Sequence, residues 1–136
     1  MNCHRDMEKA TSASKMYEFV IIGLASNRAF NCHQAIEYLK GAMKPKGIDL
    51  TPTPYNCSYK TRFEEKAANL FKHSDKGHNI LVNCGLVTIN NEHSLMTITK
   101  AGRKAYMYRT KDILTRLHIG DYKGVLELVK FYGKSK

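Results

Sequence analysis

The sequence lacks a hydrophobic run long enough to cross a membrane. Its longest apolar-dominated stretch, residues 19–25, covers seven residues, about a third of the roughly 20 that a transmembrane helix requires. The polar N-terminus also lacks the apolar segment of a signal peptide. We therefore expect a cytoplasmic protein with no membrane partner.

Cysteine pairs with the spacing of a metal or redox site are also missing. The four cysteines are separated by 29, 25 and 27 residues, so they form no C-x-x-C motif. Cys3-His4 and Cys32-His33 place two ligand types side by side, but adjacent residues of a helix point about 100° apart and cannot comfortably hold one ion. The sequence predicts reduced thiols, no metal and no other cofactor.

Known catalytic motifs are absent as well. The chain contains no G-x-S-x-G, P-loop, H-E-x-x-H or G-x-G-x-x-G pattern. Glu64 and Glu65 are neighbouring carboxylates, but neighbours in a helix diverge, so surface charge explains them better than an acid/base pair. We expect a protein that is not an enzyme.

Acidic residues are few compared with basic ones. Twelve Asp and Glu face 22 Lys and Arg, which gives a net charge of +10 in 136 residues. Residues 1–58 carry seven basic and five acidic side chains, whereas residues 59–136 carry fifteen and seven. An excess of +2 against +8 indicates an anionic partner for the C-terminal part, although a basic surface also serves solubility alone.

Residues 16–24 have the hydrophobic spacing of a helix. Tyr17, Val20, Ile21 and Leu24 fall at i, i+3, i+4 and i+7. Aromatic and β-branched residues at positions 19–22 also allow a buried strand there. The sequence leaves both readings open, with the helix favoured.

A second helix is predicted after Asn31, which stands as an N-cap with Gln34 in capping-box position. Its apolar stripe ends before Pro45, which disfavours helical geometry at Lys44. All three prolines lie in residues 45–54, which we expect to be an extended connector. The predicted stripe consists of Ala35, Ile36, Leu39 and Met43.

The next segment predicts a third helix that begins near Ser58 or Thr61 and reaches residue 73. Its outer stripe is polar, with Arg62, Lys66 and Asn69 at helical spacing. A short fourth helix is expected over residues 75–83, stopped by Gly85. The inner face of the third helix is apolar and consists of Tyr59, Phe63, Ala67, Leu70 and Phe71.

The only strong β signal follows. Residues 86–89 and 95–99 are two short β-prone runs around a polar tip, which predicts a hairpin. Thr99 is placed to cap a helix that extends to His118, and a turn at Gly120 precedes a last helix. The stripe of that last helix consists of Tyr122, Val125, Leu126, Val129 and Tyr132.

The order helix, short extended link, helix, helix, hairpin, helix resembles that of winged helix proteins. Residues 84–89, Cys-Gly-Leu-Val-Thr-Ile, resemble the G-L-[IV] start of the family's first wing strand. Residues 96–103, Met-Thr-Ile-Thr-Lys-Ala-Gly-Arg, are similar to its Y-x-L-T-x-x-G-R pattern. Regulators of the MarR type and related bacterial, archaeal and phage proteins share this pair. The resemblance is closest over residues 85–105 and looser over residues 16–43.

The resemblance implies a fold that is mainly α with a small β-hairpin wing, a winged helix-turn-helix of the α+β class. The roughly forty residues between the second helix and Gly85 exceed what a compact member needs. Two recognition helices therefore remain open. In the favoured one, residues 58–73 read the DNA groove; in the other, residues 75–83 do so through Lys76, His78, Asn79 and Asn83.

The implied function is binding of duplex DNA, as a cytoplasmic or nucleoid-associated transcriptional regulator. The alternative is an adaptor, of phage or host, that binds an acidic protein such as a nucleic-acid enzyme. The predicted DNA-binding residues lie on the third helix, its flanks, the wing tip and the helix after the wing. They are Lys60, Arg62, Lys66, Asn69, Lys76, Asn91, His93, Lys100, Arg103 and Lys104.

For the domain organisation we expect a flexible or partly helical lead-in over residues 1–15 and a winged helix domain over residues 16–110. Helices over residues 111–136 complete the chain. Their apolar stripe either packs back on residues 16–24 or pairs with a second copy in a homodimer.

Overall fold

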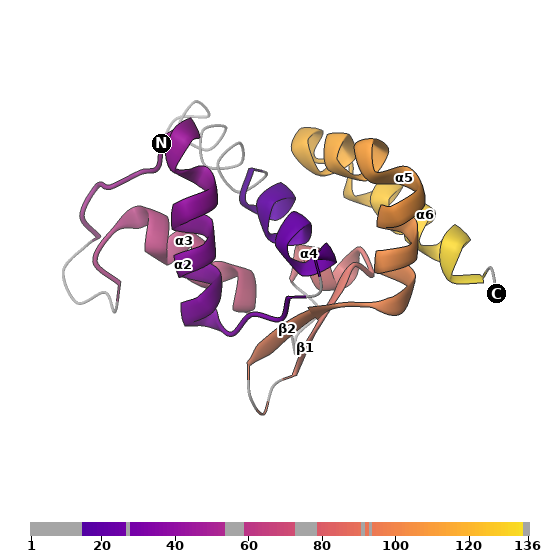
Figure 1. The fold of residues 1–136 in the computed structure, drawn as a ribbon, viewed down its shortest axis with the longest axis horizontal. Coiled ribbons are helices and arrows are strands. Elements are labelled where there is room, and N and C mark those ends of the chain that lie inside the picture. The colour runs from indigo at the N-terminus through magenta and orange to yellow at the C-terminus, as the bar shows by residue number, and fades with distance from the viewer. Residues whose placement is uncertain are drawn as a thin grey trace.

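The computed structural model describes residues 15–26, 28–53, 59–72, 79–90, 92 and 94–134. Within them the chain is mainly helical, with one two-stranded antiparallel sheet (Figure 1). Of the predicted lead-in, residues 1–14 lie outside the described part.

The hydrophobic run near the N-terminus is a helix, which spans residues 15–25 of the described part. We call it the N-terminal helix. Val20, Ile21 and Leu24 are fully buried on it. A β-carbon at Gly23 would lie 2.9 Å from the Tyr38 ring, so the absence of a side chain there allows the next helix to approach. The strand reading of residues 19–22 is wrong, because their side chains pack at helical rather than alternating spacing.

The second helix, α2 (Cys32–Met43), begins with the predicted capping box. The Asn31 side chain accepts a hydrogen bond from the backbone of Gln34 at 2.8 Å, and the Gln34 side chain accepts one from the Asn31 backbone at 2.9 Å. Its predicted stripe is fully buried. These two reciprocal bonds satisfy N–H groups that a helix start leaves free.

The connector after α2 is only partly extended. Lys44 keeps helical angles (φ −51°, ψ −45°) and begins a 3₁₀ turn, η1 (Lys44–Lys46). Pro45 fits there because the first turn of a helix does not need its missing N–H. The chain then turns at Gly47 (φ 86°) and pairs Pro52 with Thr61 in an antiparallel bridge.

The third helix, α3 (Arg62–Ala68), is shorter than expected, because residues 69–71 tighten into a 3₁₀ turn, η2 (Asn69–Phe71). Thr61 caps it by accepting a hydrogen bond from the backbone of Glu64. Only residues 80–83 of the predicted fourth helix are seen as a helix, α4 (Ile80–Asn83), since residues 73–78 lie outside the described part.

The hairpin forms as predicted. Strand β1 (Val87–Asn90) pairs with β2 (Leu95–Ile98) in the register Val87 to Ile98. Gly85 precedes it with φ 77°, a left-handed angle that suits glycine at a helix end. Phe30, in the link before α2, exchanges two backbone hydrogen bonds with Met96 at 3.0 and 2.7 Å. The predicted short extended link therefore lies against β2.

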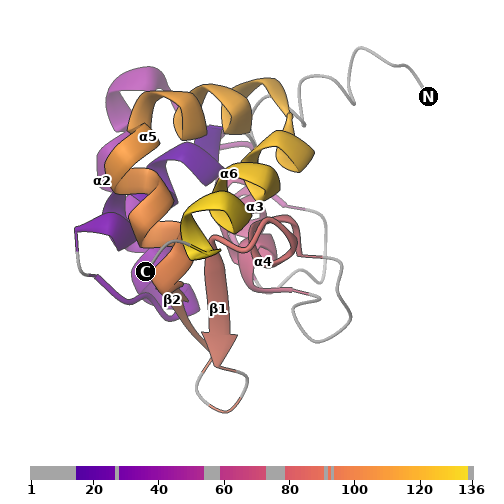
Figure 2. The ribbon, with the colours of Figure 1, turned by 90° about the vertical axis from the view of Figure 1, so that its right-hand side faces the viewer.

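Two long helices end the chain, α5 (Lys100–Ile119) and α6 (Tyr122–Lys134), which pack on one another (Figure 2). Gly120 separates them in a left-handed conformation with φ 82°. A kink interrupts α5 at Arg109, whose φ of −133° and ψ of 42° are not helical.

Residues on both sides of the predicted domain boundary at 110 share one hydrophobic core. The core joins the N-terminal helix to Ile113 and Leu117 of α5 and to Val125 and Val129 of α6. The rings of Tyr17 and Tyr122 meet edge to face at 5.9 Å. The apolar stripe of α6 thus packs within the chain, which leaves Val125 and Val129 unavailable for pairing with a second copy.

Candidate nucleic-acid interface

The cations of α3 are paired with carboxylates. Arg62 lies 3.0 Å from Glu65 and Lys66 lies 3.9 Å from Asp49. Lys40 of α2 lies 3.6 Å from Glu64. We call these six residues the α3 face. Its three positive and three negative charges compensate one another locally.

The connector contributes one of these carboxylates. Hydrogen bonds from Thr51, and then the charges of Lys66 and Arg62, lower the pKa of Asp49. The Thr51 backbone N–H donates to the Asp49 carboxylate at 3.0 Å. Asp49 therefore carries a full negative charge beside Lys66 at neutral pH.

The remaining α3 candidates are exposed. Lys60 precedes the helix, and its carbonyl accepts a hydrogen bond from Thr53 at 3.2 Å. Asn69 is the C-cap residue of α3 and leaves its side chain toward solvent. Both are accessible, but they flank a surface whose charges are already matched.

Asn79 of the alternative recognition helix is buried, with 6% of its surface exposed, whereas Asn83 is exposed. Its side-chain amide donates to the carbonyls of Leu70 and Lys72 at 2.5 and 3.3 Å. Its side-chain oxygen accepts from Val82. Asn79 therefore holds η2 against α4 and cannot read a groove, while Lys76 and His78 lie outside the described residues.

The first turn of α5 is fixed firmly to the hairpin. The Thr99 hydroxyl accepts a hydrogen bond from the Gly102 backbone at 2.8 Å and donates to the Gly85 carbonyl at 2.6 Å. A β-carbon at Gly102 would lie 2.7 Å from the Leu86 carbonyl. This close approach requires glycine and places the first turn against the chain that leads into β1.

The three predicted cations of this turn have different environments. Lys100 is exposed and has no ion-pair partner within the part of the chain that the structure describes. Arg103 donates to the Ala25 carbonyl at 3.0 Å, so it also ties α5 to the end of the N-terminal helix. Lys104 is half-buried. Of the three cations, Lys100 is the most accessible to a ligand, whereas Arg103 stabilises the contact between α5 and the N-terminal helix.

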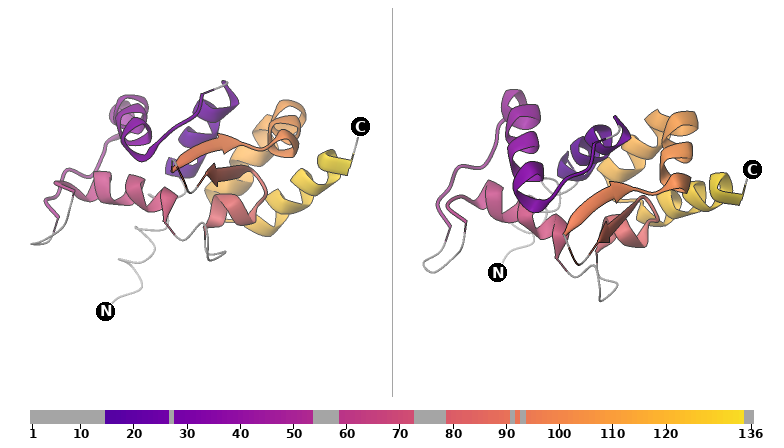
Figure 3. Two further views of the ribbon diagram at one scale, coloured as in Figure 1. Left: turned by 90° about the horizontal axis from the view of Figure 1, so that it is seen from below. Right: turned by 60° about the horizontal axis from the view of Figure 1, so that its bottom comes forward.

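The predicted residues do not form one cluster. The hairpin lies between α3 and the first turn of α5 (Figures 1 and 3). Asn91 and His93 at its tip lie outside the described residues. Lys100, Arg103 and Lys104 share one helical turn, whereas Arg62 and Lys66 belong to the far side of the hairpin.

The predicted set omits cations and rings of the C-terminal helices. Lys123, Lys130 and Lys134 are exposed on α6, and their i, i+7, i+11 spacing puts them on one face. A β-carbon at Gly133 would lie 3.1 Å from the Ala101 β-carbon, so this end of α6 lies on the first turn of α5. Tyr108 and Phe131 expose 64% and 67% of their surfaces. The spacing of these lysines could be seen in the sequence, but the exposure of the Tyr108 and Phe131 rings could not be predicted from it.

The two described cysteines are free thiols. Cys84 is buried, its thiol donates to the Tyr122 carbonyl at 3.6 Å, and burial raises its pKa to about 11. At neutral pH it is protonated and belongs to the core. Within the described ranges, no group of three or more His, Cys, Asp or Glu side chains could hold a metal ion.

None of the helices in the described part of the chain is both long and apolar enough to cross a membrane. Comparisons with protein families, with curated proteins and with solved structures find no match to this chain.

Proposed function

We propose that this chain is a winged helix protein that binds duplex DNA and regulates transcription. The hairpin would touch one stretch of backbone, and the first turn of α5 would contact the neighbouring phosphates. Binding would involve no chemistry: lysines and arginines replace the counterions that surround the phosphates.

The arrangement of the elements supports this proposal. The N-terminal helix, the Phe30 link, α2, α3 and the hairpin follow one another in the order of a winged helix domain. The link is tied to the hairpin, because Phe30 forms a bridge with Met96 of β2. The additional connector and α4 lie between α2 and β1, so they lengthen the path without changing the order.

The observation that carries the proposal is the position of uncompensated charge. Residues 59–136 hold fifteen basic and seven acidic side chains. Two of each belong to the α3 face, namely Arg62, Lys66, Glu64 and Glu65. The excess is therefore concentrated on α5 and α6, where Lys100 is exposed directly after the hairpin. A cation beside a projecting hairpin is placed to reach a phosphate.

Base reading by α3 would require its ion pairs to break. To contact DNA, Arg62 would have to break its ion pair with Glu65, and Lys66 its ion pair with Asp49. Both carboxylates would then lie near phosphates, which repel them. We infer that backbone contacts dominate and that discrimination between sequences is modest.

The test measures duplex binding by fluorescence anisotropy over a salt series. If four to six phosphates are neutralised, log K should fall against log salt with a slope of about −4 to −5. Lys100→Ala should reduce the slope by about 1. Lys46→Ala is the matched control, because Lys46 is also exposed but lies on η1. No binding of any duplex at about 50 mM salt would contradict the proposal and favour an acidic protein partner.

A further inference from the structure

Three aromatic rings form a cluster where α6 ends beside the middle of α5. Tyr108 and Tyr132 are stacked, with centroids 5.5 Å apart and planes 8° from parallel. Phe131 meets Tyr132 edge to face at 5.0 Å. We call Tyr108, Phe131 and Tyr132 the aromatic platform.

The platform faces solvent. Tyr108 is 64% exposed and Phe131 is 67% exposed, and Met107 beside them is 69% exposed. One face of the Tyr108 ring is covered by Tyr132, so the exposed fraction includes the opposite face. Large apolar groups gathered on a surface mark a site of contact with a partner.

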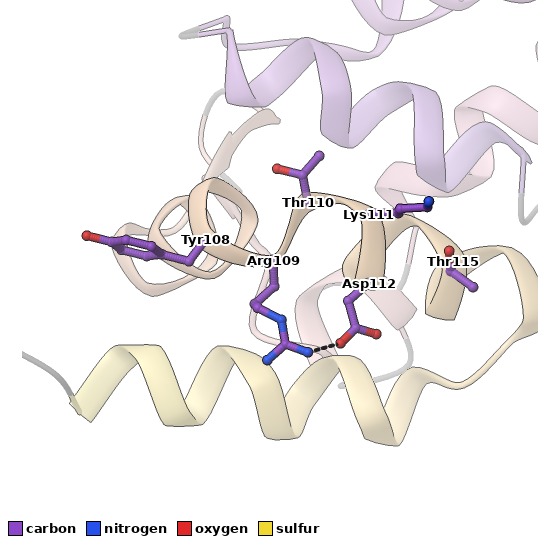
Figure 4. A pocket seen from close by; sticks show the side chains of 6 residues that line it. All are labelled: Tyr108, Arg109, Thr110, Lys111, Asp112 and Thr115. Carbon is purple, nitrogen blue, oxygen red and sulfur yellow. Dashed lines mark hydrogen bonds and ion pairs between the residues drawn. The ribbon is translucent and has the colours of Figure 1, made fainter.

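The kink in α5 opens a pocket next to this ring. Arg109 leaves helical geometry, and the Thr110 hydroxyl donates to the Tyr106 carbonyl across the break. In Figure 4, Tyr108 points away from the helix while Arg109 points toward α6. The pocket has a volume of about 450 Å³ and is lined by Tyr108, Arg109, Thr110, Lys111, Asp112 and Thr115.

The surroundings of the platform are positive. Asp112 in the pocket is bound by both Arg109 and Arg116, the latter at 2.7 Å, so its negative charge is compensated. Lys111 is exposed on the pocket wall but points away from Tyr108 in Figure 4. Lys130 and Lys134 are exposed one and three positions from Phe131 on α6, and Glu127 one turn earlier is the carboxylate closest to Phe131 along that helix.

We propose that the aromatic platform binds single-stranded DNA, with unpaired bases stacked on Tyr108 and Phe131 and phosphates held by Lys130 and Lys134. Exposed rings beside cations are what an unpaired strand needs, because every base has a face that stacks and every linkage carries a negative charge. A paired duplex hides its base faces, so it cannot stack on these rings, even where it shares the lysines of α6. The choice of DNA as the occupant rests on the proposed function of the neighbouring first turn of α5.

Charge argues against a second copy of the chain as the occupant. A symmetric contact through Phe131 would bring Lys130 and Lys134 of both copies together. Facing like charges oppose such a contact, whereas a polyanion gains from the same lysines. The charge complementarity therefore favours a nucleic acid strand.

The test compares the full chain with variants on a labelled 15-nucleotide dT strand and on a blunt duplex of equal length. The sequence contains eight tyrosines and no tryptophan, so the part of the tyrosine quenching that Tyr108→Ala removes reports stacking on Tyr108. Tyr108→Ala should weaken dT binding about tenfold, which is about 1.4 kcal/mol, and reduce the quenching. Tyr108→Phe should keep the affinity, because a benzene ring still stacks.

Ile119→Ala is the matched control, since Ile119 is 69% exposed on the same helix but at its far end. It should leave dT binding unchanged, and Tyr108→Ala should leave duplex binding within about twofold. The free energy of unfolding of each variant, measured with urea, establishes that folding is retained.

Several outcomes would overturn the inference. If the chain binds duplex but not dT, the platform proposal fails while the proposed function stands; if it binds dT but not duplex, the reverse holds. Tighter binding of an rU strand than of dT would assign the site to RNA. A dimer seen by sedimentation and abolished by Phe131→Ala would assign it to a second copy.

Discussion

The α3 face and the C-terminal helices both contain many cations, yet their surfaces differ. On the α3 face each of the cations Lys40, Arg62 and Lys66 lies within 4 Å of a carboxylate. On α5 and α6, Lys100, Lys111, Lys123, Lys130 and Lys134 are exposed, and the carboxylates Asp112 and Asp121 are bound to Arg116. The comparison shows that the number of cations in a segment says little about binding until the carboxylates are placed.

The two regions also treat their aromatic residues differently. Phe63 on α3 is 2% exposed and packs in the core, whereas Phe131 on α6 is 67% exposed. The ring on α3 is therefore part of the core, whereas the C-terminal helices expose an aromatic ring beside their cations. Substitutions confined to one of the two regions test whether the regions differ in binding as they do in charge and exposure.

The largest effect is expected where α5 is fixed to the hairpin. Gly102→Ala would place a β-carbon 2.7 Å from the Leu86 carbonyl and 2.8 Å from the Thr99 hydroxyl. Overpacking of this kind costs about 1–3 kcal/mol, so the free energy of unfolding should fall by that amount in a urea titration. The first turn of α5 would move away from the hairpin, and duplex binding should weaken with it.

Gly41→Ala on α2 is the matched control, because nothing lies within 4 Å of its β-carbon position. The same substitution there should raise stability by about 0.5–1 kcal/mol through helix propensity. Equal effects at the two glycines would show that the close approach at Gly102 does not hold α5 in place.

The caps of the helices could be predicted from sequence because they depend on residues three positions apart. Asn31 pairs with Gln34 and Thr99 caps α5 as expected, and Thr61, one of the two predicted starts of the third helix, caps α3. The hairpin was likewise readable, because alternation and turn residues are local signals. Together these local rules place most helices and both strands.

The state of the candidate site could not be predicted in the same way, because it depends on residues far apart in the chain. Lys66 meets Asp49 across the connector, and Arg103 reaches the carbonyl of Ala25. No periodicity reveals such pairs. The kink at Arg109, which lies in the pocket wall beside Tyr108, also interrupts a stretch whose sequence predicts a continuous helix.

An intermediate effect is expected at the contact that joins the N-terminal helix to α6. Burial, followed by the neighbouring Tyr122 and Cys84, raises the pKa of Tyr17 from 10.0 to about 12. The unfolded chain therefore releases this proton first, so stability present below pH 10 is lost as pH rises toward 12. The thermal midpoint should fall over this range, by about 3–5 °C for each kcal/mol lost.

Tyr17→Phe keeps the ring contact with Tyr122 but removes the ionisable hydroxyl. Its thermal midpoint should fall less between pH 10 and 12 than that of the parent chain. Parallel declines in the two proteins would mean that Tyr17 ionises equally easily in the folded and unfolded states.

The smallest effect, and the one that addresses the comparison most directly, comes from removing one negative charge from either region. Asp49→Asn removes the ion-pair partner of Lys66 on the α3 face, and the new side chain still offers an oxygen to the Thr51 N–H. Because exposed ion pairs contribute about 0–1 kcal/mol, the substitution should cost little stability. Glu127→Gln makes the same change of charge on α6, beside Lys123 and Lys130. If DNA contacts the C-terminal helices, Glu127→Gln should raise duplex affinity about twofold at low salt, since a nearby carboxylate repels phosphate, and Asp49→Asn should change it less. Anisotropy titrations of both variants on one duplex measure the ratio of the two gains in affinity. A larger gain from Asp49→Asn would show that α3 faces the DNA. Its ion pairs, rather than its position, would then limit its contribution to binding.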